Sequence, residues 1–306
     1  MLRPRTQGLL LASFCTLIWG FQYPVGRIVL GEAATLSPIV GAFYKFLFAT
    51  VGMLPFALFA APPATFARAI REDFPGLFRA ALFGVFAEGF LALYSVKYTT
   101  AARSSLLCNM SPLFTVILAA IVARRWPGKI TIFGLAVGIL GSYLIFLSSA
   151  SDIYSGGNAT TLPGDLLALA SGLAWAYFTI ACAPLGKKHG ALPCTVIMLA
   201  FSTLFLLIWC ICTGTPFLIP LPRTAWLGLL FLGTLATGIC VGLWNAAAMR
   251  LSPDAIGAFG YGSAAIGMLS GIFGLKETIS WRFALAVACC MFAVWLMNTY
   301  ADTENH

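Results

Sequence analysis

The chain has 306 residues, of which 60% are hydrophobic and only 9% are charged, and its formal net charge is +8. Soluble domains carry about a quarter charged residues, so this composition excludes an ordinary water-soluble protein. No run of Lys and Arg is longer than two residues, which argues against a nucleic-acid-binding protein and favours loops facing an anionic lipid surface.

Apolar segments of the length that a bilayer requires, about 20 residues, recur along the whole chain. They are twice as long as the strands of a membrane barrel and show no alternation, so we expect helices, which satisfy their own backbone hydrogen bonds. The sequence therefore predicts an all-α membrane protein with ten transmembrane helices. The expected spans are 8–29, 36–59, 77–98, 100–122, 130–149, 164–185, 193–213, 224–248, 254–275 and 280–300.

Basic residues at the ends of these spans predict the orientation. With a cytoplasmic N-terminus, eleven of the eighteen Lys and Arg residues fall on the cytoplasmic side and six on the outer side, while Lys45 lies within a span. Cytoplasmic loops carry an excess of positive charge, so we expect both termini in the cytoplasm. The expected location is a bacterial inner (plasma) membrane.

The two halves of the chain resemble one another. GLLLASFCTLIWGF, from Gly8, aligns without gaps with GDLLALASGLAWAY, from Gly164, and pairs Trp19 with Trp175 at an offset of 156 residues. Spans four and five overlie spans nine and ten at an offset near 152. Five spans is an odd number, so the second half would be inverted, as in many secondary transporters. We expect two five-helix repeats, 1–150 and 151–306; accidental similarity between apolar helices is the alternative.

Four stretches of the chain carry motifs in a distinctive order and spacing: IWGFQYPVGR (18–27), ALYSVKYTTAARSSLLCNMSPLFTVILAAIVARRW (92–126), GDLLALASGLAWAYFTI (164–180) and LWNAAAMRLSPDAIGAFGYGSAAIGMLSGIFGLKETIS (243–280). These stretches resemble the EamA branch of the drug/metabolite transporter superfamily. The resemblance implies ten helices as two inverted repeats, cytoplasmic termini and the transport, often export, of small metabolites. AEGFLALYS around Glu88 and WN at 244–245 are most similar to the aromatic amino-acid exporters of the family.

The sequence departs from the family pattern at two places. Arg125 stands where the second half has Glu277, so an acid at this loop position is not shared by the halves. Ala264 stands where Pro112 predicts a proline, so we expect only the first half to have its fourth helix broken near the middle.

Two charged residues, Lys45 and Glu88, lie near the centres of the second and third spans. Charged groups facing lipid are costly, so both are expected to face the bundle interior or an aqueous cavity. In the functional interpretation, Lys45 binds the carboxylate and Glu88 the ammonium of a zwitterion, or Glu88 carries a proton. In the structural alternative, a permanent ion pair locks the two helices together.

Aromatic residues near the centres of two repeat-related spans predict the walls of a shared cavity. Trp19 and Trp175 occupy the middle of spans one and six, although tryptophan is usually enriched at membrane interfaces. Such rings can stack on an apolar or cationic substrate. Tyr23 and Tyr177 follow on the same helices and would extend the walls, whereas ordinary helix packing is the alternative.

Polar residues on spans four, eight and nine complete the predicted substrate site. Pro112 leaves the carbonyl of Cys108 without its helical partner, and Asn109 lies beside it. Asn245 and Tyr261 are weaker candidates, and Asn245 lies towards the cytoplasmic end. An ordinary kink, with Asn109 bonded to a neighbouring helix, is the alternative interpretation.

Nothing in the sequence predicts an enzyme. P-loop, GxSxG, HExxH and GxGxxG motifs do not occur, and the nine cysteines lack the spacing of a metal site, so we expect neither cofactor nor metal. Of the two histidines, His189 is expected in a short loop and His306 in the C-terminal tail.

We therefore expect a secondary active transporter that exports small metabolites, most of all amino acids, by alternating access driven by substrate or proton gradients. The expected partners are the substrate and the lipid bilayer, and a monomer and a homodimer both stay open. The alternatives are an exchanger of sugar-phosphates or drugs and a membrane channel. An exchanger that binds phosphate would need several cationic side chains at mid-depth, where only Lys45 is found.

Overall fold

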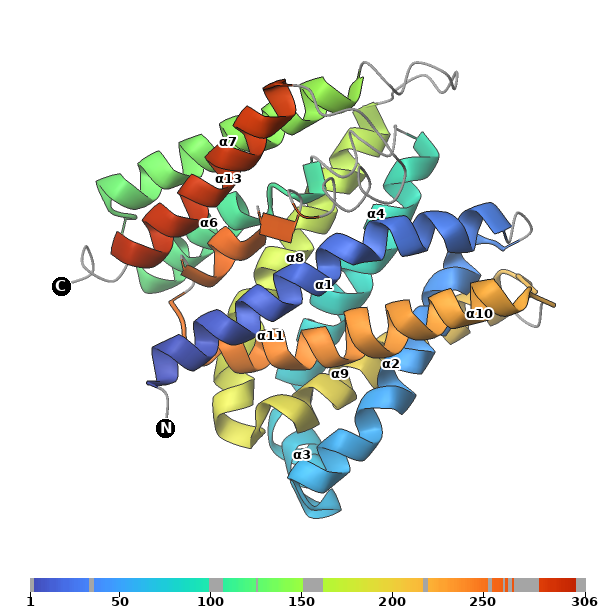
Figure 1. Ribbon diagram of the computed structural model, residues 1–306. Helices are drawn as coiled ribbons and strands as arrows, with labels where there is room; N and C mark the ends of the chain where they lie inside the picture. Colours follow the sequence, from blue (N-terminus) through green and yellow to red (C-terminus); the bar gives the residue numbers. More distant parts are fainter. Residues whose placement is uncertain are drawn as a thin grey trace.

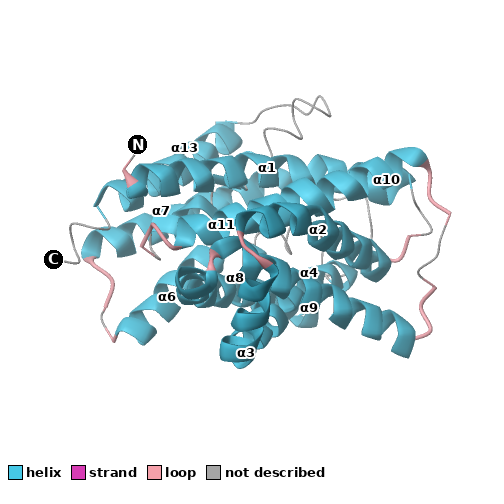
Figure 2. Ribbon diagram, turned by 90° about the horizontal axis from the view of Figure 1, so that it is seen from below, coloured by secondary structure: helices cyan, strands magenta, loops and turns pink. Residues whose placement is uncertain are grey.

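The computed structural model describes residues 3–32, 36–98, 107–124, 126–150, 162–216, 220–252, 255–260, 262–263, 266 and 281–300, and within these ranges the chain is helical and has no strand. Figure 1 and Figure 2 show the helices packed into one bundle. The labelled elements are α1 (Pro4–Glu32), α2 (Pro38–Ala60), α3 (Pro63–Arg79), η1 (Ala80–Phe86), α4 (Ala87–Tyr98), α6 (Ser111–Ala123), α7 (Lys129–Ala150), α8 (Leu162–His189), α9 (Ala191–Cys212), α10 (Arg223–Leu230), η2 (Phe231–Ile239), α11 (Cys240–Ala248) and α13 (Trp281–Tyr300).

The all-α prediction is confirmed for the described residues. Each of the ten expected spans contains helical residues, and five helices in the described ranges are long and apolar enough to cross a membrane. That all ten segments cross it stays a prediction. The break expected ahead of Pro112 is present, because Asn109 and Met110 form a turn and α6 begins at Ser111. Its counterpart at Ala264 lies outside the described residues.

Two helices contain a π-helical segment that the sequence analysis did not predict. The helix from α3 to α4 is widened over η1, and the helix from α10 to α11 is widened over η2. Both segments continue directly into α-helix on either side, and they occupy equivalent places in the two halves. A π-helical turn shifts the hydrogen-bond register, so it frees backbone groups and is often found at functional sites.

The contacts between helices repeat with approximate two-fold symmetry. α2 packs on η2 as α9 packs on η1, and α1 packs on α10, η2 and α11 as α8 packs on α3, η1 and α4. The pairs α2–α9 and α7–α13 each join equivalent helices of the two halves. Figure 1 shows α7 and α13 side by side at one edge of the bundle.

A pair of threonines lies between equivalent helices of the two halves. Thr50 Oγ1 of α2 and Thr203 Oγ1 of α9 are 3.0 Å apart and share a hydrogen bond. Because a hydroxyl has one proton, one threonine donates across and the other donates back to its own helix: Thr50 Oγ1 lies 2.8 Å from the carbonyl of Phe46, and Thr203 Oγ1 lies 2.9 Å from that of Leu199. Thr203 follows Thr50 by 153 residues, and Leu199 follows Phe46 by the same number. The two threonines are therefore equivalent residues of the two halves.

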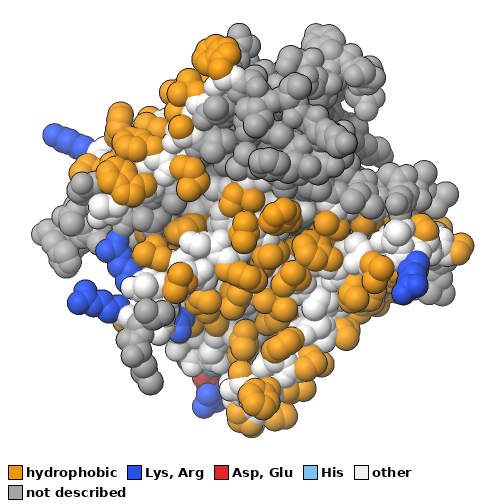
Figure 3. All heavy atoms as spheres, viewed as in Figure 1, with side chains coloured by type: hydrophobic (Ala, Val, Ile, Leu, Met, Phe, Trp, Pro, Cys, Tyr) orange, Lys and Arg blue, Asp and Glu red, His pale blue; other side chains and the backbone are white. Residues whose placement is uncertain are grey.

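Basic side chains gather at one end of the bundle. The start of α1 and the end of α13 lie on the same side in Figure 1 and Figure 2. In Figure 3, most Lys and Arg side chains on the visible face lie towards that side, and the middle of the face is largely hydrophobic. This distribution fits helices that cross an apolar layer between two aqueous ends.

Candidate functional site

Three tryptophans from three helices meet in the middle of the bundle. The ring centroids of Trp19 in α1 and Trp175 in α8 are 5.2 Å apart in an edge-to-face arrangement. Trp244 in α11 lies 4.9 Å from Trp19 and 5.9 Å from Trp175, and it is only 1% exposed. We call these three residues the tryptophan cluster. The repeat-related pair predicted from the sequence is therefore brought together, with a third ring that was not predicted.

Hydrogen bonds fix two of the three indole rings. Trp19 Nε1 donates to the carbonyl of Ala236 in η2 at 2.7 Å, and Trp244 Nε1 donates to Thr179 Oγ1 at 3.2 Å. In an α-helix the amide of Cys240 would donate to Ala236, but here it donates to the carbonyls of Leu235 and Thr237. The π-helical register thus makes the Ala236 carbonyl available to Trp19.

The sequence analysis expected Trp19 and Trp175 to line a shared cavity, and that role stays a prediction. The two rings touch each other, so in this conformation they join α1 to α8. Tyr177 is partly buried and has no ring contact with the cluster among the described residues. The side chain of Tyr23 and the whole of Tyr261 lie outside the described residues.

Lys45 of α2 and Glu88 of α4 lie near the same level of the bundle. Both side chains are partly buried, and the charge of Lys45 acts on Glu88. They form no ion pair within 4.0 Å in the described part of the chain, and the Lys45 ammonium lies 5.8 Å from the ring centroid of Phe46. The permanent lock considered in the sequence analysis is therefore not closed in this structure.

Symmetric hydrogen bonds show which residue of the second half corresponds to Glu88. Ser171 Oγ of α8 donates to the carbonyl of Glu88 at 3.0 Å, and Cys15 Sγ of α1 donates to the carbonyl of Cys240 at 3.2 Å. Cys15 and Ser171 are 156 residues apart, the offset that also relates the paired tryptophans. Cys240 is thus the counterpart of Glu88, 152 residues later.

The second half makes the same helix crossings without charges. Lys45 corresponds to Met198 by the offset of 153 residues that relates Thr50 to Thr203, and Met198 is fully buried. Glu88 corresponds to Cys240, which is also fully buried. Because apolar residues serve at both positions in one half, the framework does not require a Lys and a Glu in the other.

The fourth and eighth spans place their polar residues differently. The carbonyl of Cys108, ahead of Pro112, lies against Gly172 of α8, where an added Cβ would be 2.8 Å from the oxygen. Asn109 is partly buried in the adjoining turn. Asn245 is buried and donates to Thr195 Oγ1 of α9 at 2.6 Å, which places it between two helices.

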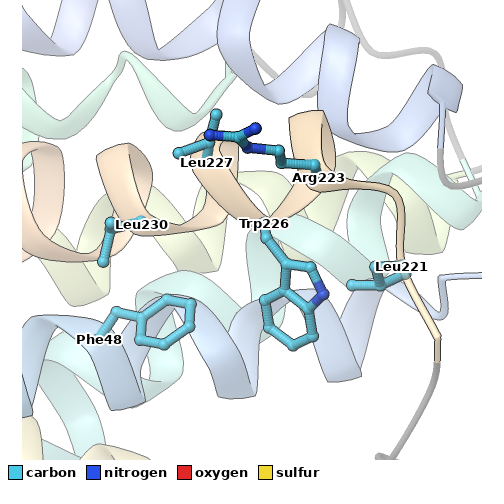
Figure 4. Close-up of a pocket in the computed structure, with 6 residues that line it drawn as sticks. All are labelled: Phe48, Leu221, Arg223, Trp226, Leu227 and Leu230. Carbon is cyan, nitrogen blue, oxygen red and sulfur yellow. The ribbon is translucent and has the colours of Figure 1, made fainter.

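A separate groove lies on the surface between α2 and α10 (Figure 4). It has a volume of about 510 Å³. In Figure 4, Trp226 points from α10 towards α2, on which Phe48 lies. Among the predicted site residues whose side chains the structure describes, none lines this groove, so it is distinct from the described part of the candidate site. Its lining residues are Phe48, Leu221, Arg223, Trp226, Leu227 and Leu230.

One expectation for a histidine was wrong. His189 does not lie in a loop: it is the last residue of α8, and its side chain is 1% exposed. A single residue, Gly190, with φ of 93°, links α8 to α9, so no loop is left in which His189 could lie. His189 Nε2 lies 2.5 Å from Asp73 Oδ2 of α3, a contact that the sequence analysis did not predict.

Comparisons with known proteins agree with this architecture. The sequence profile of the EamA-like transporter family matches residues 6–147 and again residues 162–299. An uncharacterised transporter of Archaeoglobus fulgidus is 28% identical over 208 residues, covering 67% of each chain. A protein of Salmonella typhimurium named as a probable amino-acid metabolite efflux pump is 25% identical over 303 residues, covering 95% of this chain and 94% of its own. One solved crystal structure covers 98% of this chain and 99% of its own with a TM-score of 0.79 at 17% identity, which shows a shared fold.

Proposed function

Because the chain belongs to the EamA-like transporter family, whose profile matches both of its halves, we propose that it is a secondary active carrier that exports amino acids or similar small zwitterions by alternating access. That the chain is a membrane transporter follows from the family. The substrate class, the direction and the mechanism are the proposal.

The single observation that carries the substrate class is the unequal charge of two equivalent sites. Lys45 and Glu88 stand where the second half has Met198 and Cys240, so the charges are an addition to a framework that folds without them. Buried charges are expensive and are found where they bind ions or substrates. One cation and one anion, held apart, match the two charged groups of a zwitterion.

The tryptophan cluster supplies an apolar surface beside this polar pair. Ser171, whose hydroxyl holds the Glu88 carbonyl, precedes Trp175 by one turn of α8. Gly233 of η2 lies against the carbonyl of Lys45, and the same π-helical segment accepts the bond from Trp19. A zwitterion held at Lys45 and Glu88 would thus present its side chain to aromatic rings.

One relative supports amino acids in particular. The Salmonella typhimurium protein named as a probable amino-acid metabolite efflux pump aligns over nearly the full length of both chains. A sugar-phosphate exchanger is the weaker candidate, because the sequence places only Lys45, among the Lys and Arg residues, near the centre of an expected span.

Three further features belong to the proposal. The units 1–150 and 151–306 are the two halves that rock against each other, and all ten segments cross the bilayer. Both termini lie in the cytoplasm, on the side where the basic residues gather. Glu88 takes up a proton in each cycle and couples transport to the proton gradient.

The test uses purified protein in proteoliposomes and a panel of labelled amino acids, sugar-phosphates and cationic drugs. We expect substrate-dependent flux for a subset of the amino acids, accelerated by a proton gradient. Flux of sugar-phosphates with none of amino acids would contradict the proposed substrate class.

A further inference from the structure

The same contact between the two halves occurs at both ends of the bundle. At one end Gly76 of α3 lies against Leu185 of α8, where an added Cβ would be 3.2 Å from Leu185 Cδ2. At the other end Gly228 of α10 lies so close to Val29 of α1 that an added Cβ would overlap its side chain. The two glycines are 152 residues apart and the two aliphatic residues 156, so the contacts are equivalent. The inverted repeat thus places equivalent contacts between the halves at opposite ends of the bundle.

At the Gly76 end, an ionic cluster includes a residue whose equivalent at the opposite end is apolar. One turn outside the Gly76 contact, Asp73 Oδ2 lies 2.6 Å from Lys188 Nζ and 2.5 Å from His189 Nε2. Glu72 Oε2 adds a second carboxylate 3.4 Å from the same ammonium. At the opposite end, the position equivalent to Asp73 is Ala225, which is fully buried.

We propose that Asp73, Lys188 and His189 form an ionic latch that holds one end of the transport pathway closed. The latch joins the first half to the second through α3 and α8, at the end where α1 begins. It rests on the alternating-access mechanism proposed above, because a latch has a function only in a carrier whose ends open in turn.

The chain geometry around Asp73 suits a contact that is made and broken. Asp73 itself leaves helical geometry, with φ of −131° and ψ of 28°, so α3 is kinked at the latch. The turn of α3 before the kink can therefore move with the latch while the apolar part that follows stays packed. On α8, Lys188 and His189 lie in the last turn, where cations interact favourably with the helix dipole.

The latch combines exposed and buried groups, which keeps it reversible. The Lys188 side chain is 53% exposed and that of Asp73 29%, so their attraction is screened by water and salt. His189 is buried, and its Nδ1 has no hydrogen-bond partner among the described residues. Burying that atom without a partner opposes closure, while the bond from Nε2 to Asp73 favours it. The ammonium of Lys188 supplies a positive charge beside the group formed by Glu72, Asp73 and His189.

A native cysteine reports whether this end is open. Cys194 of α9 is fully buried, and its thiol donates to the carbonyl of Leu185 at 3.4 Å, so it lies directly behind the Gly76 contact. The experiment measures the rate at which a water-soluble maleimide modifies Cys194 in the purified full-length protein in nanodiscs, mapped by peptide mass spectrometry. Asp73→Asn should raise this rate about tenfold, the factor expected when a buried donor loses its charged acceptor.

The neighbouring lysine gives a matched control. Lys187→Gln removes an exposed charge that has no ion pair among the described residues, and it should leave the rate at Cys194 unchanged. The exchange Asp73→Lys with Lys188→Asp restores an opposite-charge pair and should return the rate towards that of the wild type. Equal rates for Asp73→Asn and Lys187→Gln would overturn the latch.

A second cysteine separates opening from unfolding. Cys210 is buried near the far end of α9 and should react at the wild-type rate in Asp73→Asn. If Cys194 and Cys210 are both accelerated equally, the variant has loosened the whole protein and the latch is refuted. Because no substrate is used, failure of the latch is distinguishable from failure of the proposed transport activity.

Discussion

Lys45 and Met198 occupy equivalent positions in the two halves. Methionine is therefore a suitable replacement for Lys45, because the second half already packs a methionine at the equivalent helix crossing. We expect Lys45→Met to reduce the transport of a zwitterionic substrate at least about tenfold, because the substrate carboxylate loses a charged hydrogen bond. The free energy of unfolding should not fall, since a methionine packs at the same crossing in the other half. Transport at the wild-type rate, measured in proteoliposomes beside a thermal unfolding curve, would leave Lys45 without a role in binding.

Glu88 allows a separate test of proton coupling. Glu88→Gln keeps the shape of the side chain and removes its titration, so transport should become independent of pH if this carboxylate carries the proton. The measurement is the initial rate of export from acidic to mildly alkaline pH, for the variant and the wild type. Parallel pH profiles would assign the proton to another group.

At the scale of the element, the π-helical segment η2 and Trp19 depend on each other. Trp19→Phe keeps an aromatic ring but leaves the Ala236 carbonyl without its indole donor, at a cost of about 1–3 kcal/mol in unfolding free energy. Trp175→Phe is the matched control, because the Trp175 indole N–H makes no hydrogen bond within the described residues. Equal losses of stability in the two variants would mean that the bond to Ala236 contributes nothing.

Composition predicted the helices well because a long apolar run in lipid has few other structures available. The same reasoning missed η1 and η2, since a change of hydrogen-bond register leaves no trace in hydrophobicity. The sequence analysis placed the start of the third span at residue 77, whereas α3 begins at Pro63. The earlier start was missed because the segment from Phe66 to Asp73 is amphipathic and lacks the apolar run of a span. His189 was misplaced because KKHG has the composition of a loop.

The candidate site was predictable in part. Repeat alignment brought Trp19 and Trp175 together, and the rarity of charges singled out Lys45 and Glu88. Trp244 was missed as a member of the cluster because its counterpart in the first half is Ala92, so the internal alignment gave no signal. The bond between Ser171 and Glu88 joins residues 83 positions apart, and no local pattern encodes such a contact.

At the scale of the whole molecule, the two-fold arrangement predicts which ends share a compartment. Cys212 is exposed at the end of α9, opposite to the end where Arg68 of α3 is exposed. An impermeant maleimide added to intact cells should modify Cys212, and it should modify Arg68→Cys only after lysis. The reverse pattern would place the termini on the outer side.

We propose above that Lys45 and Glu88, two charged residues of the first half alone, bind a zwitterion in a carrier that opens to each side in turn. A counterflow experiment measures both properties: vesicles preloaded with an unlabelled amino-acid substrate are diluted into a trace of the labelled form. The wild type should accumulate label transiently, and Lys45→Met should accumulate none. Wild-type vesicles that equilibrate without accumulation would indicate a channel, and accumulation by Lys45→Met equal to that of the wild type would contradict the role of Lys45 in binding.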